Sequence, residues 1–222
     1  MIHLNADIGE IPKHIADGTQ EAILPFVTMV NIACGGHAGT PETMRDSIAQ
    51  AQKYRLQIGA HPGYPDPANF GRMDLDLPLD TVIQTVNDQI QTLARFTKEI
   101  RHVKPHGALY NQAANNPDLA RAIARGVARV SREFTLIGLA KSKMLEVFAD
   151  EGFPVMAEAF ADRRYNPDGS LVSRTLPDAL IEDPAEAVAQ VLRMKDIQTI
   201  CVHGDTPGAA AIARAVAQAL LR

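Results

Sequence analysis

The sequence of 222 residues has few cysteines, little net charge and no long apolar run. Its two cysteines, Cys34 and Cys201, are too few for a disulfide framework, and we expect free thiols in a reducing compartment. A net charge of -4 argues against a nucleic-acid partner or an anionic membrane. No apolar run approaches the roughly 20 residues of a membrane span, and residues 1–4 lack the features of a signal peptide. We therefore expect a cytoplasmic protein.

The chain also lacks a Ser/Gly-rich linker, a composition shift or a low-complexity run that would mark a domain boundary. The apolar fraction of 46% is enough for a full core. We expect residues 1–222 to form one domain.

Short apolar runs alternate with segments of helical periodicity along the chain. The strand-like runs are 3–8, 29–34, 57–60, 102–104, 135–139, 154–159 and 199–202. The apolar spacing predicts a helix over about 80–99, among others. Four helices are predicted to begin at a capping residue followed by proline, which loses no needed N–H there. These starts are Thr40-Pro41, Asn116-Pro117, Asp183-Pro184 and Thr206-Pro207.

Strand–helix alternation repeated about seven times predicts an α/β fold with a parallel sheet, either open or closed. Polar side chains follow nearly every strand, as the mouth of a barrel requires, whereas an open sheet uses one switch point. They are Asn5, Asp7 and Glu10; Asn31, Cys34 and His37; His61; Lys104 and His106; Glu158, Asp162 and Arg163; and His203 and Asp205. We therefore predict a TIM-like (β/α) barrel of about seven parallel strands.

The segment 102–110 carries the densest group of reactive side chains. Pro105 should end the strand pairing, and Gly107 permits a turn, so Lys104 and His106 are expected at a strand end. His61, also followed by proline and glycine, repeats this pattern, and Arg72 lies on the loop beyond it.

Each of these features also has a structural explanation. Asp7 could form a turn, the charged residues at 158–165 could pair with one another, and Asp205 could support a helix start. The glycine-rich segment 34–39 could bind an anion but lacks the Gly-Lys-Ser/Thr of a P-loop. Together, however, the polar groups favour a site at one end of the barrel.

Imidazole and carboxylate side chains at that end suit a divalent transition metal. Asp7, His37, His61 and His106 are the candidate ligands, although no H-E-x-x-H spacing is present. The same groups could carry out metal-free acid–base chemistry, and the sequence does not choose between the two.

Six motifs resemble the LamB/YcsF family over almost the whole chain. They are LNADIGE at 4–10, NIACGGHAG at 31–39, GAHPGYPD at 59–66, HVKPHGALY at 102–110, EAFADR at 158–163 and TICVHGDTPG at 199–208. The resemblance implies a barrel related to metal-dependent polysaccharide deacetylases. It also implies ATP-coupled opening of 5-oxoproline to glutamate by a 5-oxoprolinase, with the B and C subunits of that enzyme as partners. ATP would bind this chain or a partner.

Three departures from the family pattern affect this expectation. Residues 11–14 replace a glycine-aromatic loop, Gly36 replaces a phenylalanine, and the stretch 194–199 is shorter than usual. The first two concern the substrate side of the site, and the third concerns the partner surface.

For this reaction we expect Asp7 or His203 to act as the base, and Lys104 with the N–H groups near Gly35 and Gly36 to stabilise negative charge. Arg72 or Arg163 would bind the substrate carboxylate. The remaining expected substrate-binding residues are Asn5, Asn31, His37, His61, His106, Glu158 and Asp205.

Two other functions stay open. One is a metal-dependent amide hydrolase acting on a carbohydrate or N-acyl substrate without ATP. The other is a non-catalytic subunit that binds a ligand for its partners. The sequence also leaves a homo-oligomer open.

Overall fold

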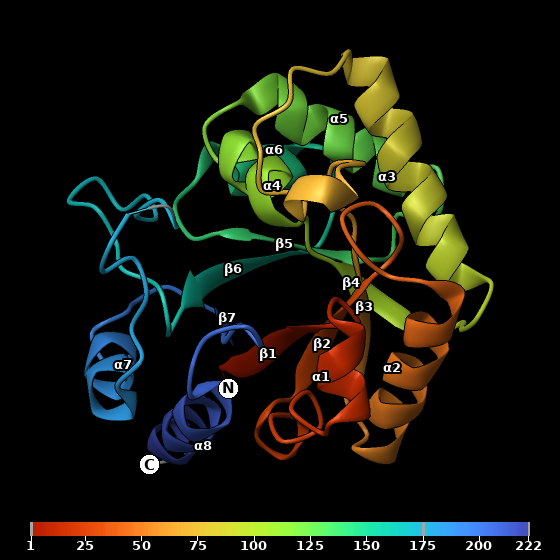
Figure 1. The fold of residues 1–222 in the computed structure, drawn as a ribbon. Helices are drawn as coiled ribbons and strands as arrows, with labels where there is room; N and C mark the ends of the chain where they lie inside the picture. The colour runs from red at the N-terminus through yellow and green to blue at the C-terminus, as the bar shows by residue number, and fades with distance from the viewer. Residues whose placement is uncertain (1, 175, 222) are drawn as a thin grey trace.

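A computed structural model describes residues 2–174 and 176–221 and contains a closed barrel of seven parallel strands (Figure 1). The strands follow one another around the barrel in chain order, and the first pairs with the last. They are β1 (His3–Ile8), β2 (Met29–Ala33), β3 (Gln57–His61), β4 (Ile100–Val103), β5 (Thr135–Leu139), β6 (Val155–Phe160) and β7 (Thr199–Cys201). The prediction of a barrel of about seven strands is confirmed, with strand ends shifted by one or two residues in five cases.

The strands are apolar along most of their length because helices cover their outer faces and side chains fill the interior. All five residues of β2 are buried. The register places Asp7 beside Asn31 and Ala33 beside His61. Polar residues distant in sequence therefore become neighbours around the barrel.

A bulge between β3 and β4 determines the position of His102. The register shifts after Ile58, so that Gly59 lies opposite His102. A Cβ atom on Gly59 would lie 2.1 Å from His102 Nε2, so the glycine leaves the space that the ring fills. His102 is therefore inside the barrel, beneath the strand end where Lys104 lies.

The helices surround the barrel (Figure 1). They are α1 (Pro12–Ala16), α2 (Pro41–Lys53), α3 (Leu79–Ala94), α4 (Gly107–Ala113), α5 (Pro117–Ala128), α6 (Lys143–Asp150), α7 (Pro184–Val191) and α8 (Ala209–Leu220), with short 3-10 helices at Leu24–Phe26 and Pro67–Asn69. The predicted starts of α2, α5 and α7 are confirmed. Thr40, Asn116 and Asp183 each accept hydrogen bonds from the first turn of their helix.

Two helix predictions are wrong at one end. The helix predicted over 80–99 ends at Ala94, because the chain must turn through 95–99 to enter β4 at Ile100. The last helix does not begin at Thr206-Pro207. It begins at Ala209, after Gly208 in a left-handed conformation (φ 75°). The Thr206 hydroxyl donates instead to Asp162 Oδ2 at 2.6 Å.

The connection between β6 and α7, residues 161–183, is long, and its described residues, 161–174 and 176–183, contain no helix. Antiparallel bridges join Arg163 to Leu180 and Tyr165 to Leu171. In Figure 1 this connection projects to one side of the barrel, between β6 and α7. Among the described residues, no helix is both long and apolar enough to cross a membrane.

Candidate functional site

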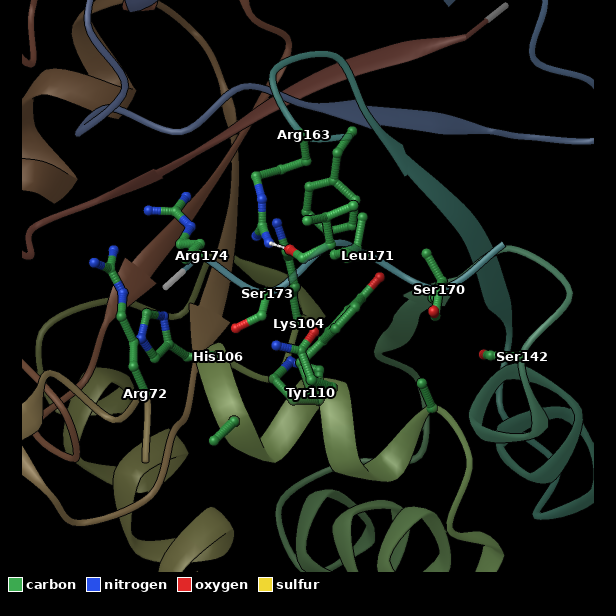
Figure 2. A pocket seen from close by; sticks show the side chains of 18 of the residues that line it. Arg72, Lys104, His106, Tyr110, Ser142, Arg163, Ser170, Leu171, Ser173 and Arg174 are labelled. Atoms are coloured by element: carbon green, nitrogen blue, oxygen red, sulfur yellow. Dashed lines mark hydrogen bonds between the residues drawn. The ribbon is translucent and has the colours of Figure 1, made fainter. Parts of the chain in front are cut away.

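A cavity of about 1000 Å³ opens at the carboxyl ends of the strands (Figure 2). Its lining comes from residues at or just after the carboxyl ends of β1, β3, β4, β5, β6 and β7 and from the connections beyond them. It includes Asp7, Glu10, His61, Arg72, Lys104, His106, Tyr110, Ser142, Phe160, Arg163, Arg174 and His203. The structure therefore brings seven of the predicted site residues to one cavity.

Asp7 lies at the base of the cavity, near the end of β1. Its Oδ1 accepts hydrogen bonds from Asn31 Nδ2 at 2.7 Å and Lys104 Nζ at 3.1 Å. Its Oδ2 lies 3.3 Å from His61 Nε2. Burial by itself would raise the pKa of Asp7, but His61 and Lys104 outweigh burial and hold the pKa well below its usual range. Asp7 is therefore a buried carboxylate, not an exposed turn residue.

Lys104 is buried between two carboxylates. Its Nζ lies 3.1 Å from Asp7 Oδ1, 2.9 Å from Glu158 Oε1 and 3.0 Å from Cys201 Sγ. Burial opposes its charge, but Asp7, Cys201 and Glu158 raise the pKa of Lys104 well above its usual value. Because the three protons of the ammonium group already face acceptors, a substrate oxygen must displace one of them.

A fully buried polar layer supports Asp7 and Lys104 from beneath. Asn5 Nδ2 donates to Glu158 Oε1 at 3.0 Å, and Asn5 Oδ1 accepts from Asn31 Nδ2 at 2.8 Å. Asn31 Oδ1 in turn lies 2.9 Å from His102 Nε2. Asn5, Asn31 and Glu158 do not line the cavity, so the structure places them under the expected substrate-binding surface.

Three histidines and Glu10 form a second cluster beside Asp7. Glu10 Oε1 lies 2.9 Å from His37 Nε2, 3.2 Å from His106 Nδ1 and 3.8 Å from His61 Nε2. The rings of His37 and His106 stack with centroids 3.5 Å apart. The four residues follow β1 to β4 in order, so each strand contributes one group.

Backbone carbonyl groups determine which histidine nitrogens are free. His61 Nδ1 lies 2.7 Å from Lys104 O, and His106 Nε2 lies 2.8 Å from Phe70 O. A carbonyl oxygen only accepts, so each of these nitrogens carries the proton. His61 Nε2 and His106 Nδ1 then face each other at 3.0 Å as lone pairs. Such a contact needs either a shared proton or a cation.

The donor set fits a divalent metal ion. One ligand atom each from Glu10, His37, His61 and His106 lies within 4.8 Å of the others. Tetrahedral zinc, with bonds of about 2.1 Å, places its ligands about 3.4 Å apart. The distances from Glu10 Oε1 to the three histidine nitrogens, 2.9 to 3.8 Å, are close to this value. The sequence predicted Asp7 in this set, whereas in the structure Glu10 occupies the central position.

Two glycines make room for the histidine pair. A Cβ atom on Gly63 would lie 2.8 Å from His37 Nδ1. Gly71 has a φ of 62°, and a Cβ atom there would lie 2.6 Å from His37 Cβ. The loop after β3 therefore packs its backbone directly on the rings.

His203 follows β7, which pairs with β1 on the side away from β2. It therefore approaches Asp7 from the side opposite to the histidine cluster. Its Nδ1 lies 3.0 Å from Asp162 Oδ1, and its ring stacks on Phe160. Burial would raise the pKa of Asp162, but His203 and Thr206 lower it. Asp162 thus accepts the Nδ1 proton and leaves Nε2 of His203 as a base.

Arginine side chains border the outer part of the cavity. Arg72 and Arg174 both pair with Asp205 Oδ2, the latter at 2.8 Å. Arg163 is 5% exposed, and its Nη2 donates to Val172 O at 2.7 Å. Asp205 therefore holds two arginines and does not support the start of the last helix.

The expected contribution of Gly35 and Gly36 is not found. The Gly35 N–H donates to Ala38 O at 2.8 Å. Gly36 packs against Gln89, whose Oε1 would lie 2.3 Å from an added Cβ atom. Neither glycine lines the cavity.

Several residues of the site could not be assigned a role from the sequence. Glu10 and Asp162 were recognisable only as polar groups at strand ends. Tyr110 was part of the motif at 102–110 without a role of its own, and Arg174 carried no local signal. A connection as long as 161–183, with no helix among its described residues, is itself a signal of function, and its residues 168–174 line the cavity. His37 lies behind His106 and does not line the cavity.

The fold and the site define a (β/α)-barrel protein with a buried group of acid–base and metal-ligating residues at the carboxyl ends of its strands. Within that class, residues 2–222 match the model of the LamB/YcsF family, and the chain belongs to this family.

Relatives of known name resemble the chain over almost its full length. It is 46% identical over 238 aligned residues to the 5-oxoprolinase A subunit of Chloroflexus aurantiacus, covering 99% of this chain and 94% of that protein. It is 43% identical to the 5-oxoprolinase A subunit of Limosilactobacillus fermentum, covering 95% and 92% of the two chains.

Solved structures agree with this assignment. The lactam utilization protein from Thermus thermophilus superposes with a TM-score of 0.90 at 36% identity, covering 99% of this chain and 96% of that one. A family 4 carbohydrate esterase from Streptomyces lividans has a TM-score of 0.53 at 13% identity, covering 99% and 87%. The second likeness concerns the fold alone.

Proposed function

We propose that this chain is the A subunit of an ATP-dependent 5-oxoprolinase, which hydrolyses the lactam of 5-oxoproline to L-glutamate together with B and C subunits. The observation that carries the proposal is the identity of 46% to a 5-oxoprolinase A subunit, over 99% of this chain. A cavity with buried acid, base and cationic groups supports the same conclusion.

The chemistry of the substrate explains the need for ATP. A lactam carbonyl is a poor electrophile, and transfer of the terminal phosphoryl group of ATP to its oxygen would activate the carbon. Water then adds to that carbon, and the ring C–N bond breaks with the nitrogen taking up a proton, which leaves an acyl phosphate of glutamate. A second water hydrolyses the acyl phosphate, so that the products are glutamate, ADP and phosphate. The described residues include no recognisable P-loop, so ATP binds here in another way or binds a partner.

His203 is the residue that best fits the base toward water. Its Nδ1 donates to Asp162, so the lone pair of Nε2 is available to accept a proton from water. Asp7, the other expected base, is engaged by Lys104, Asn31 and His61 and has a lowered pKa, which weakens it as a proton acceptor.

Asp7 and Lys104 serve better to organise charge at the base of the cavity. The Lys104 ammonium group, already held between Asp7 and Glu158, can donate to a developing oxyanion that displaces one of these acceptors. Arg72 or Arg163 would bind the carboxylate of the substrate through charge-assisted hydrogen bonds.

A divalent metal such as zinc would bind Glu10, His37, His61 and His106. When bound, it would supply a Lewis acid that polarises the lactam carbonyl. In its absence the residues hold a proton: burial lowers the pKa of His61, but Asp7 and Glu10 raise it above its usual value overall. Metal binding would therefore release a proton.

The direct test is glutamate release from 5-oxoproline by the full chain, with and without ATP and with and without the B and C subunits. We expect release only with ATP and both partners. Release that needs a metal but no ATP would instead support the metal-dependent amide hydrolase, which the histidine cluster also favours. A ligand affinity that is unaffected by D7N would support the non-catalytic, ligand-binding role.

A further inference from the structure

We propose that Arg163 and Arg174 form a subsite for a phosphoryl dianion, so that this chain binds a ligand that already carries a phosphoryl group. The inference rests on the proposed function. The ligand would be either the phosphorylated lactam or the co-substrate ATP. Figure 2 shows both arginines, with Arg72, on the side of the cavity that also holds His106.

The first argument is the balance of charge. Arg72 and Arg174 share one carboxylate, Asp205. Arg163 forms no ion pair with any described residue. Its neighbour Asp162 accepts from the His203 N–H at 2.8 Å and from the Thr206 hydroxyl at 2.6 Å. Asp162 is nevertheless an ionised carboxylate near Arg163, so three guanidinium groups face two carboxylates, Asp205 and Asp162, and one positive charge is left for a ligand.

The other carboxylates on the cavity wall do not pair with these arginines, and two of them, Asp7 and Glu10, face Lys104 and the histidines. Asp168 is exposed and accepts from the backbone N–H of Ser170 at 2.9 Å. Asp74 is exposed as well, and within the described residues neither forms an ion pair with an arginine. Neither carboxylate therefore supplies an acceptor to Arg163 or Arg174.

The second argument is that buried donors lack acceptors. Arg163 Nε and Arg174 Nη2 are buried, and neither has a hydrogen-bond partner in the part of the chain that the structure describes. A buried charged donor without an acceptor is costly, and phosphoryl oxygens are strong acceptors matched to guanidinium groups. Arg163 is 5% exposed, so a bound ligand is the available source of an acceptor.

The third argument is that the subsite is held rigidly. Val172 O accepts from Arg163 Nη2 at 2.7 Å, and the Val172 N–H donates to Arg164 O at 2.9 Å. The bridge between Tyr165 and Leu171 closes the same connection. The guanidinium groups are thus positioned before a ligand arrives, which lowers the entropy lost on binding.

The cations also repel one another. Burial lowers the pKa of Arg163 to about 10, and Arg174 and Arg72 act in the same direction. A dianion between Arg163 and Arg174 would relieve this repulsion. Arg72, which is more exposed, would then remain for the substrate carboxylate.

Titration calorimetry of inorganic phosphate into the full chain tests the subsite without partners or turnover. We expect phosphate to bind at least tenfold more tightly than acetate at equal ionic strength. R163Q and R174Q should each weaken phosphate binding at least tenfold, and R163K should restore part of it. The matched control is R164Q, because Arg164 pairs with Glu186 away from the cavity and should not affect phosphate.

Equal affinities for phosphate and acetate, or unchanged phosphate binding in R163Q and R174Q variants with wild-type melting curves, would overturn the proposal.

A parallel titration with ATP identifies the source of the phosphoryl group. Binding of ATP much tighter than phosphate, and lost in R163Q, assigns the subsite to the nucleotide. Affinities for ATP and phosphate that match assign it to a phosphorylated lactam. Failure of glutamate release would contradict the proposed function. The phosphate titration does not depend on turnover and would still test the subsite.

Discussion

Lys104 and Asp7 form the buried ion pair on which the site depends, with Glu158 as the second carboxylate. Removing one member of a buried pair leaves an uncompensated charge, typically at a cost of about 3–5 kcal/mol. Replacing one of these side chains by alanine would therefore lower activity by unfolding the protein as well as by removing a catalytic group, and the two effects could not be told apart. Substitutions that preserve shape separate the two effects.

The substitution D7N keeps the shape of the side chain and removes its charge. We expect it to lower glutamate release by the complete complex about 100-fold or more, because Lys104 and His61 lose the charge that holds them. Steady-state kinetics with a melting curve make the measurement. D74N, at an exposed carboxylate of the cavity wall, is the control and should retain most activity. Wild-type rates in D7N would remove Asp7 from the reaction.

His102 should make stability depend on pH. Burial, with Lys104 and His61, lowers its pKa from 6.5 to about 3, so the folded chain keeps the ring neutral while the unfolded chain protonates it. This stability is complete above pH 6.5 and is lost as the pH falls toward 3, by about 1.4 kcal/mol per pH unit for one such group.

Urea unfolding between pH 7 and 4 tests this expectation. H102Q, whose amide can still donate to Asn31, should show a shallower fall of the unfolding free energy than the wild type, whatever its stability at pH 7. Parallel curves for the two proteins would contradict the assignment.

At the scale of elements, helix starts are set by side-chain oxygens that accept the first free N–H groups. In α5 the Asn116 side chain accepts from Asp118 and Leu119, both at 3.1 Å. We expect N116A to destabilise the protein by about 1 kcal/mol without changing activity. Denaturant unfolding measures this loss, and R125A, at an exposed position of the same helix, should remain within about 0.5 kcal/mol.

The turn between β7 and α8 contains Thr206, whose hydroxyl contacts a residue of the site. Thr206 does not cap the helix but donates to Asp162, which orients His203. We expect T206V to lower kcat several-fold, to leave KM nearly unchanged and to shift the acidic limb of the pH–rate profile, because Asp162 loses a donor. T206S should restore both rate and profile. A uniform loss in both variants would indicate packing alone.

At the scale of the whole molecule, the first and last strands pair through Asn5 and Cys201, and we propose that residues 1–222 form one domain on this basis. The proposed metal ligands follow four consecutive strands, so an ion bound there would link a large part of the barrel.

Zinc should therefore raise the melting temperature of the chain. A ligand at 100 times its Kd stabilises the folded state by about 2.7 kcal/mol, which corresponds to a rise of several degrees for a protein of this size. Differential scanning fluorimetry near pH 7.5 measures it. E10Q should lose most of the rise, whereas E146Q, at an exposed carboxylate of α6, should keep it. Equal shifts in all three proteins would contradict the site.

The order of elements, the closed barrel and the grouping of the site at strand ends were all predictable. They follow from local patterns: apolar runs, capping residues and polar side chains at strand ends. Helix ends were less predictable, as the end of α3 at Ala94 and the start of α8 at Ala209 show. The path of the chain between strand and helix determined both positions, against the local apolar spacing and capping signals. Glu10 was visible at the end of the first strand, but its contacts depend on residues brought in by three other strands.

The sequence by itself determined the class of fold and which residue types meet at the mouth of the barrel, because strand periodicity and strand-end position are local properties. Only the tertiary structure decided which groups are partners. It placed Asn5, Asn31 and Glu158 beneath the cavity and surrounded Glu10 with histidines. It also left the buried Nε of Arg163 without a hydrogen-bond partner among the described residues. These outcomes depend on the register of the barrel and on loop packing. Both are determined by contacts between residues far apart in the chain, which no local pattern contains.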